Sequence, residues 1–213
     1  MAREARPVSP RAYQSDKRQA AAEETRERIL GAARRILAGK GVVQVTIDSV
    51  AREADVSRQT VYNAFGSKSG LLEALCDALA NRGRLDRLAG AMTQGSPDAA
   101  LAGFVEVFCR FWAADRVVTR RLRGLAVADR DLDRVLRERD ERRRHGLRAL
   151  LRLFPELVDG SAEPQDDLVD LLWTLTSFET FDVLATKTRG VAAVAALLTD
   201  AAGAVLGLPG QRH

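Results

Sequence analysis

The segment 46–68, TIDSVAREADVSRQTVYNAFGSK, constrains the fold most, because it predicts two short helices joined by a tight turn. Thr46 and Ser57 stand at N-cap positions, where a hydroxyl accepts a hydrogen bond from the first turn. Val56 and Val61 are spaced to form a hydrophobic staple around the second cap. These features predict a helix-turn-helix.

The second of these helices is predicted to carry a polar outer face. Val61, Ala64 and Phe65 share one side and are expected to turn toward the body of the protein. The other side chains are long, polar and suited to base edges or phosphates: Arg58, Gln59, Thr60, Tyr62 and Asn63. We therefore interpret this helix as one that lies in the major groove of a DNA duplex.

The residues from Thr46 to Lys68 follow the pattern T-I-x-x-V-A-x-x-A-x-V-S-x-x-T-V-Y-x-x-F-x-x-K. An amphipathic helix over 23–38 precedes it, and a leucine-rich helix over 71–79 follows it, so that the pattern covers about 60 residues. This segment resembles the amino-terminal domain of TetR-family transcriptional regulators.

The resemblance implies a role for each polar residue. Thr46, Lys68 and the Tyr62 hydroxyl are expected to bind phosphates, which set the register on the duplex. Gln59 and Thr60 are expected to face the bases, and Arg58 reaches either a guanine or a phosphate. The predicted DNA-binding residues are Thr46, Ser57, Arg58, Gln59, Thr60, Tyr62, Asn63 and Lys68.

Three positions depart from the family pattern. Asp55 replaces the usual glycine of the turn and is expected to adopt a left-handed conformation at some cost. Asn63 and Ala64 stand where a basic residue and a histidine are frequent, so one contact to DNA is expected to be missing. Gly70 stands where an acidic residue would complete a capping box with Ser67, which predicts a looser helix start.

Composition favours a helical fold throughout. Of the 213 residues, 46% are hydrophobic and only 5% are aromatic, and the β-branched runs are short. We predict an all-α protein of about nine helices. Its parts are a disordered basic arm over 1–22, a three-helix helix-turn-helix domain over 23–85, and a larger helical effector-binding and dimerisation domain over 86–208, with a loop near Gly90.

The formal charge of +4 suits an anionic partner. The arginine-rich segment 116–152 is either a second nucleic-acid patch or a solvated helix face, and its interspersed acidic residues favour the solvated face. Cys76 and Cys109 lie among apolar residues and are predicted to be buried and unpaired. No signal peptide is recognised, and the apolar stretch 190–208 contains Asp200, so we expect a cytoplasmic protein without a membrane partner.

The helices after residue 97 supply the candidate effector site and the candidate dimer interface. Aromatic residues gather there and predict a hydrophobic or aromatic effector, although such a stripe also suits a plain core. The candidate effector-binding residues are Phe104, Phe108, Trp112, Leu122, Trp173 and Phe178. The last two helices are apolar on more than one side, which favours a homodimer over a monomer. The candidate interface residues are Leu168, Leu172, Leu175, Val194, Leu198, Ala201 and Val205.

The sequence contains no recognisable catalytic or metal-binding constellation. His145 and His213 stand alone, and residues 66–69 lack the spacing of a phosphate-binding loop. We therefore expect no enzymatic activity, metal or cofactor. The leading hypothesis is a homodimeric, ligand-responsive repressor that binds a palindromic operator in double-stranded DNA. The alternatives are a weakly specific architectural DNA-binding protein and a helical ligand-binding or protein-interaction module that no longer binds DNA.

Overall fold

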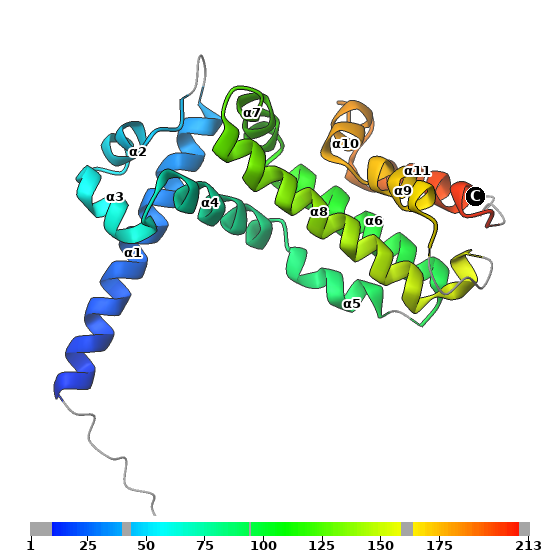
Figure 1. Ribbon diagram of the computed structural model, residues 1–213, viewed down its shortest axis with the longest axis horizontal. Coiled ribbons are helices and arrows are strands. Elements are labelled where there is room, and N and C mark those ends of the chain that lie inside the picture. Colours follow the sequence, from blue (N-terminus) through cyan, green and yellow to red (C-terminus); the bar gives the residue numbers. More distant parts are fainter. Residues whose placement is uncertain (1–9, 40–43, 94, 159–163, 209–213) are drawn as a thin grey trace, which may run out of the picture. The chain divides into compact units, whose positions relative to one another are not determined.

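The computed structural model describes residues 10–39, 44–93, 95–158 and 164–208, and the regular structure in these ranges is helical throughout (Figure 1). The prediction of an all-α fold is confirmed. The helices, in chain order, are α1 (Pro10–Ala38), α2 (Ile47–Glu53), α3 (Arg58–Phe65), α4 (Lys68–Arg82), α5 (Leu88–Met92), α6 (Pro97–Ala114), α7 (Arg116–Ala126), α8 (Arg130–Leu153), α9 (Asp166–Leu175), α10 (Phe178–Leu184) and α11 (Val191–Val205). Two short 3-10 helices, η1 (Leu85–Arg87) and η2 (Pro155–Val158), complete this described part.

The described ranges hold two more α-helices than the nine or so expected. One is α5, which forms where the sequence predicted a loop. The other arises because the helix expected over 165–186 is broken at Thr176 and Ser177 into α9 and α10. The Ser177 hydroxyl accepts a hydrogen bond from the backbone N–H of Thr180 and so caps a new helix, which is the usual effect of a hydroxyl residue at a helix start.

Helix α1 begins much earlier than the predicted start at residue 23. Residues 10–22, which were expected to belong to a disordered arm, are helical in the structure. Pro10 occupies the first helical position, where proline is favoured, and strong helix formers without glycine or proline follow it. Intrinsic propensity therefore extends the helix although apolar periodicity is absent. Residues 1–9 of the predicted arm lie outside the described residues.

The chain folds as two compact units, residues 1–75 and 76–213. The boundary lies within α4, whereas the sequence placed it between residues 85 and 86. Helix α4 continues without a break from Lys68 to Arg82 and so belongs to both units. Each unit has its own buried residues and is described separately below.

The amino-terminal unit packs α2 and α3 against α1 and against each other, and the start of α4 approaches the end of α3 closely at Gly70 and Phe65. Its core contains Ile29 and Leu37 of α1, Val50 of α2, Val61 of α3 and Leu71 of α4, all of which are fully buried. Burying an aliphatic side chain of this size contributes about 1.5–3 kcal/mol. These contacts hold α2 and α3 at a fixed angle, as the sequence predicted for a helix-turn-helix.

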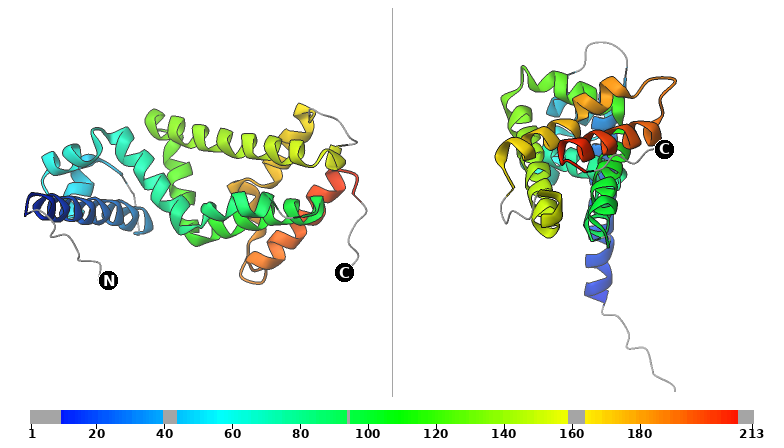
Figure 2. Two further views of the ribbon diagram at one scale, coloured as in Figure 1. Left: turned by 90° about the horizontal axis from the view of Figure 1, so that it is seen from below. Right: turned by 90° about the vertical axis from the view of Figure 1, so that its right-hand side faces the viewer.

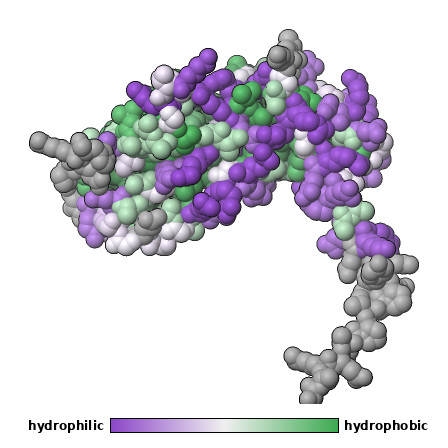
Figure 3. All heavy atoms as spheres, turned by 180° about the vertical axis from the view of Figure 1, so that it is seen from behind, coloured by the Kyte–Doolittle hydropathy of each residue, from purple (hydrophilic) through white to green (hydrophobic). Residues whose placement is uncertain are grey.

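The carboxyl-terminal unit is organised around α6, which packs against α5 on one side and α11 on the other (Figures 1 and 2). Helix α8 packs against α7 and α9. The core between these helices includes Phe104, Leu147, Phe181 and Val194, which are buried. Apolar atoms also reach the surface of this unit, where they are mixed with charged side chains (Figure 3).

Candidate nucleic-acid interface

The helix-turn-helix is set by two side-chain caps. The Thr46 hydroxyl accepts a hydrogen bond from the backbone N–H of Ser49 at 3.1 Å, and the Ser49 hydroxyl accepts one from the Thr46 backbone N–H at 3.0 Å. This reciprocal capping box fixes the start of α2. The Ser57 hydroxyl accepts from the backbone N–H of Thr60 at 3.0 Å and fixes the start of α3. Both N-caps were predicted, whereas the role of Ser49 was not, because the usual partner in a capping box is Glu or Gln.

The turn between α2 and α3 contains Asp55 in a left-handed conformation, with φ of 52°. This is the conformation that the sequence predicted for the position. Asp tolerates positive φ better than most residues, although it still pays a cost that glycine avoids. The short turn therefore keeps its geometry without the usual glycine.

The polar face of α3 points away from the core. Arg58, Gln59 and Asn63 are exposed, and 41% of Tyr62 is accessible to solvent. Thr60 is half-buried beside the cap, and Lys68 is half-buried at the start of α4. The helix therefore presents to solvent most of the side chains that were predicted to meet a duplex.

Several of these side chains are already engaged with one another. The Arg58 guanidinium forms an ion pair with Asp48 of α2, with 2.7 Å between Nε and Oδ1. The Gln59 amide donates to the Asn63 side-chain oxygen at 2.8 Å, one helical turn further on. The Ser57 and Thr60 hydroxyls lie 2.8 Å apart and share a hydrogen bond. The exposed face is thus a set of internally paired polar groups.

Arg26 of α1 holds the carboxyl end of α3 in place. Its guanidinium donates to the Ala64 carbonyl oxygen at 2.8 Å and lies over the Phe65 ring, 4.4 Å from its centre. A cation over an aromatic face contributes about 0.5–1 kcal/mol at an exposed site. The orientation of α3 therefore depends on a residue that lies outside the predicted motif.

Gly70 has a role other than the one inferred from the sequence. The Ser67 hydroxyl accepts from the Gly70 backbone N–H at 3.0 Å, so the start of α4 is capped. A Cβ atom on Gly70 would lie 2.2 Å from the Phe65 carbonyl oxygen. Glycine is needed here because the backbone of α3 passes too close for any side chain, and the absent acidic residue of a capping box has no place there.

The carboxyl-terminal unit contains a cavity of about 290 Å³. Three of the six predicted effector-binding residues line it, namely Phe108, Trp112 and Leu122. Phe104 is fully buried in the core, and Phe178 is buried with its ring edge against Trp112. Trp173 faces a different surface recess, beside α7 and α8. The aromatic residues therefore divide between cavity wall and core, the two alternatives that the sequence left open.

The arginines of α7 and α8 mostly join helices to one another. Arg116 and Arg120 of α7 both contact Asp182 of α10, and Arg123 binds Asp140 of α8 with both terminal nitrogens. Other ion pairs connect α8 to α9. Segment 116–152 was expected to be a solvated face or a second nucleic-acid patch, but most of its pairing serves the packing of this unit.

The predicted interface residues fall into two groups. Leu172, Val194 and Leu198 are buried in the core of their own unit, so these three are unavailable to a second copy in this arrangement. Leu168, Leu175 and Ala201 are half-buried, and Val205 is exposed. The exposed large apolar residues of the last three helices are Leu171, Val183, Leu197 and Val205.

The remaining candidates from the sequence are the histidines, the cysteines and the apolar stretches. In the described ranges, no group of three or more His, Cys, Asp or Glu side chains is placed to hold a metal ion. His145 is exposed on α8, and His213 lies outside the described residues. Cys76 and Cys109 are buried and free, as predicted. Among the described helices, none combines the length and the apolarity needed to cross a membrane.

Comparison with known proteins places the helix-turn-helix in a family. Residues 29–75 match the family described as bacterial regulatory proteins, tetR family. The HTH-type transcriptional regulator AlkX of Mycobacterium tuberculosis is 36% identical over 111 residues, which cover 49% of this chain and 50% of AlkX. The match thus spans about half the length of that curated relative.

Solved structures share the whole fold. A transcriptional regulator from Rhodococcus sp. Rha1 has a TM-score of 0.62 at 21% identity, with 85% of this chain and 96% of that chain covered. A TetR-like transcriptional regulator from Rhodococcus sp. RHA1 has a TM-score of 0.59 at 24% identity, with 86% and 96% covered. The fold and the capped helix pair define a helix-turn-helix protein with a helical second unit. Residues 29–75 are therefore similar to the amino-terminal domain of the TetR family of bacterial transcriptional regulators, and the chain shares the fold of these solved structures.

Proposed function

We propose that this protein is a homodimeric, ligand-responsive transcriptional repressor that binds a palindromic operator. The observation that carries the proposal is the outward polar face of α3, which is capped by Ser57 and fixed by a buried Val61. A helix held in this way can enter the major groove as a rigid body, with its amino-terminal side chains at the base edges.

The proposed contacts follow the positions of the side chains. Gln59 is assigned to a base, Arg58 to a base or a phosphate, and Tyr62 and Lys68 to phosphates. Arg58 must leave Asp48 to reach DNA, because its guanidinium is engaged in the free protein. An exposed ion pair of this kind contributes about 0.2–1 kcal/mol, so its loss is a small cost against a new phosphate or guanine contact.

Dimerisation is proposed through the last helices. Leu171, Val183, Leu197 and Val205 expose apolar surface on α9, α10 and α11, and α11 also exposes several alanines. A second copy would cover this surface, and the proposal requires that the two α3 helices of the dimer reach successive major grooves, roughly 34–36 Å apart. Twofold symmetry in the protein then corresponds to a palindrome in the operator.

Ligand response is proposed for the cavity of the carboxyl-terminal unit. Its apolar lining includes Phe108, Phe111 and Trp112, which suits a hydrophobic body. A ligand weakens DNA binding only to the extent that it binds the DNA-free conformation more tightly. No catalytic step is part of this proposal. The architectural alternative is less well supported, because the arginines on which it depended are used within the unit.

Selection of bound sequences from a random duplex pool tests the proposal. We expect a palindrome bound about 10³–10⁷ times more tightly than random duplex. Gln59→Ala should relax the preference at one base pair of each half-site, whereas Tyr62→Phe should weaken binding to every sequence alike. Affinity that falls equally with salt on all sequences, with no enriched palindrome, would reject a specific repressor in favour of electrostatic binding.

A further inference from the structure

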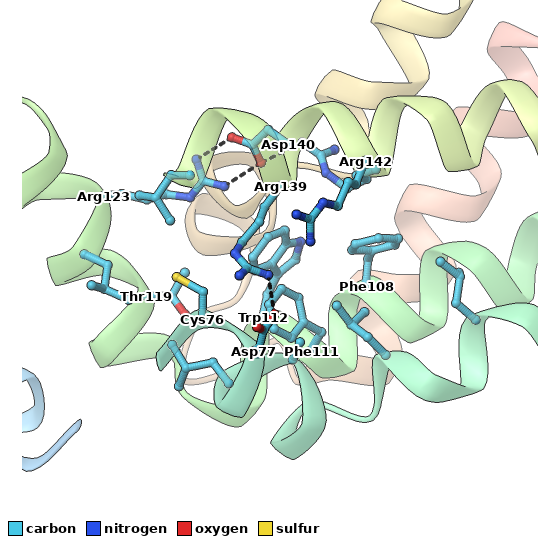
Figure 4. A pocket seen from close by; sticks show the side chains of 17 residues that line it. Cys76, Asp77, Phe108, Phe111, Trp112, Thr119, Arg123, Arg139, Asp140 and Arg142 are labelled. Atoms are coloured by element: carbon cyan, nitrogen blue, oxygen red, sulfur yellow. Dashed lines mark hydrogen bonds and ion pairs between the residues drawn. The ribbon is translucent and has the colours of Figure 1, made fainter. Parts of the chain in front are cut away.

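The cavity of the carboxyl-terminal unit has an apolar side and a side that carries several arginines. Leu79 and the neighbouring aromatic residues of α6 form one side, and α7 and α8 supply the charged side (Figure 4). Phe111 and Trp112 lie against each other, with ring centres 4.4 Å apart, and Phe108 continues the cluster. The surface offered to a ligand is therefore divided into an apolar half and a basic half.

Positive charge exceeds negative charge on this lining. The arginines are Arg123, Arg139, Arg142 and Arg143, and the acidic residues are Asp77 and Asp140. Arg139 pairs with Asp77 at 2.9 Å. Asp140 forms ion pairs with both Arg123, at 2.9 Å, and Arg143, at 3.5 Å. Two carboxylates thus pair with three of the four arginines and leave the lining with a net positive charge.

Arg142 is the fourth arginine of the lining and pairs with neither carboxylate. Within the part of the chain that the structure describes, its guanidinium has no ion pair. In Figure 4 its side chain descends from α8 toward the cavity, near Arg139 and Phe108. An arginine beside an apolar wall keeps its charge at any physiological pH and needs an acceptor once a ligand excludes water.

Buried donors strengthen the case for an anion. Arg143 is 4% exposed, and the Nε atoms of Arg123 and Arg143 have no hydrogen-bond partner among the described residues. Burial lowers the pKa of Arg143 to about 10, because desolvation opposes its charged form. A nearby anion would offset that cost, whereas a neutral ligand would add to it by displacing water from Arg142.

We propose that the cavity binds a small amphipathic carboxylate. Its aromatic or aliphatic body lies on Phe108, Phe111 and Trp112, and its carboxylate is held by Arg142 beside Arg139. A cavity of about 290 Å³ accommodates a ligand of about a dozen non-hydrogen atoms. This inference rests on the proposed role of the cavity as the effector site and specifies the chemistry of the effector.

Calorimetric titration of the full chain with matched probes tests the inference. The probes are 4-phenylbutyrate against 4-phenylbutyramide, and decanoate against decanamide, because each pair differs in charge and hardly in shape. We expect at least one acid to bind roughly ten- to hundredfold more tightly than its amide, which is the range of a charge-assisted contact. Arg142→Gln should remove that difference, and Arg142→Lys should keep part of it.

Arg134→Gln is the matched control, because Arg134 is exposed on the same helix, pairs with Glu138 and does not line this cavity. Amides that bind as well as the acids, an acid preference that survives Arg142→Gln, or no binding by any probe would each overturn the inference. Duplex selection on the same protein separates the two proposals. An enriched palindrome without acid preference rejects only the effector chemistry, and acid preference without DNA binding rejects the repressor while the carboxylate site stands.

Discussion

Replacing Gly70 with alanine tests the packing of the helix-turn-helix more directly than any change on its surface. The new Cβ would lie 2.2 Å from the Phe65 carbonyl oxygen and 3.3 Å from its carbon, both of which are backbone atoms. The Phe65 carbonyl also accepts a hydrogen bond from the Ser67 N–H at 2.8 Å, so it cannot move without loss. Relief of the clash must therefore shift the end of α3 relative to α4.

The expected cost follows from these contacts. Overpacking of this kind costs about 1–3 kcal/mol, and the better helix propensity of alanine returns about 0.5–1 kcal/mol. The free energy of unfolding of the amino-terminal unit should therefore fall by about 1–2 kcal/mol. For a unit of this size, such a loss lowers the unfolding midpoint by roughly 5–10 °C.

Two spectroscopic probes make the assay specific for the affected unit. Both tryptophans, Trp112 and Trp173, lie in the carboxyl-terminal unit, so their fluorescence follows that unit, whereas far-ultraviolet circular dichroism follows both. Gly70→Ala should lower the temperature at which the dichroism signal begins to change. The midpoint temperature of the fluorescence transition should stay nearly unchanged.

Gly31→Ala is the control for helix propensity. A Cβ on Gly31 meets only the end of the Arg35 side chain, at 3.5 Å, so this change should stabilise the same unit by about 0.5–1 kcal/mol. If Gly70→Ala is as stable as the wild type, or is stabilised as Gly31→Ala is, the close approach of α3 and α4 is refuted.

Two further predictions concern the carboxyl-terminal unit. Hydrogen bonds from Arg120 and Arg116 lower the pKa of Asp182, so its contribution to stability is present at neutral pH and lost as the pH falls through the aspartate range. Urea unfolding should show Asp182→Asn less stable than the wild type at pH 7, with a smaller difference at pH 3, and an equal difference at both pH values would contradict this. Burial raises the pKa of Cys76 to about 11 and that of Cys109 to about 12, so iodoacetamide at pH 8 should alkylate the folded protein far more slowly than the urea-unfolded chain. Similar rates in both states would show that the thiols are accessible.

Local chemistry was predictable from sequence where one residue decides the outcome. Ser57 caps α3 and Asp55 adopts positive φ because a hydroxyl and a short carboxylate side chain suit those backbone positions regardless of distant packing. The pairing of Arg58 with Asp48 depends on how α2 and α3 cross. The hydrophobic periodicity of the sequence does not determine the angle at which these two helices cross.

The burial of a charged side chain was the main feature that could not be predicted from the sequence. Arg143 stands in a run of charged residues that is typical of a solvated helix, yet it is buried against Trp173 and Thr176. Leu172 of α9 and Val194 of α11 were predicted to face a second copy, but both are buried in the core of their own unit. In both cases the burial comes from contacts between helices that are far apart in the sequence, which the pattern of one helix cannot reveal.

The internal pairing of the α3 side chains has a thermodynamic consequence for the proposed operator binding. Gln59 and Arg58 would exchange a bond within the protein for a bond to DNA, so a correct site gains little net enthalpy from them. An incorrect site breaks the internal bond and offers nothing in return. Discrimination would then arise mainly from weaker binding of incorrect sequences. A substitution of Asn63 would alter base preference through its hydrogen bond with Gln59, even if Asn63 itself contacts no base.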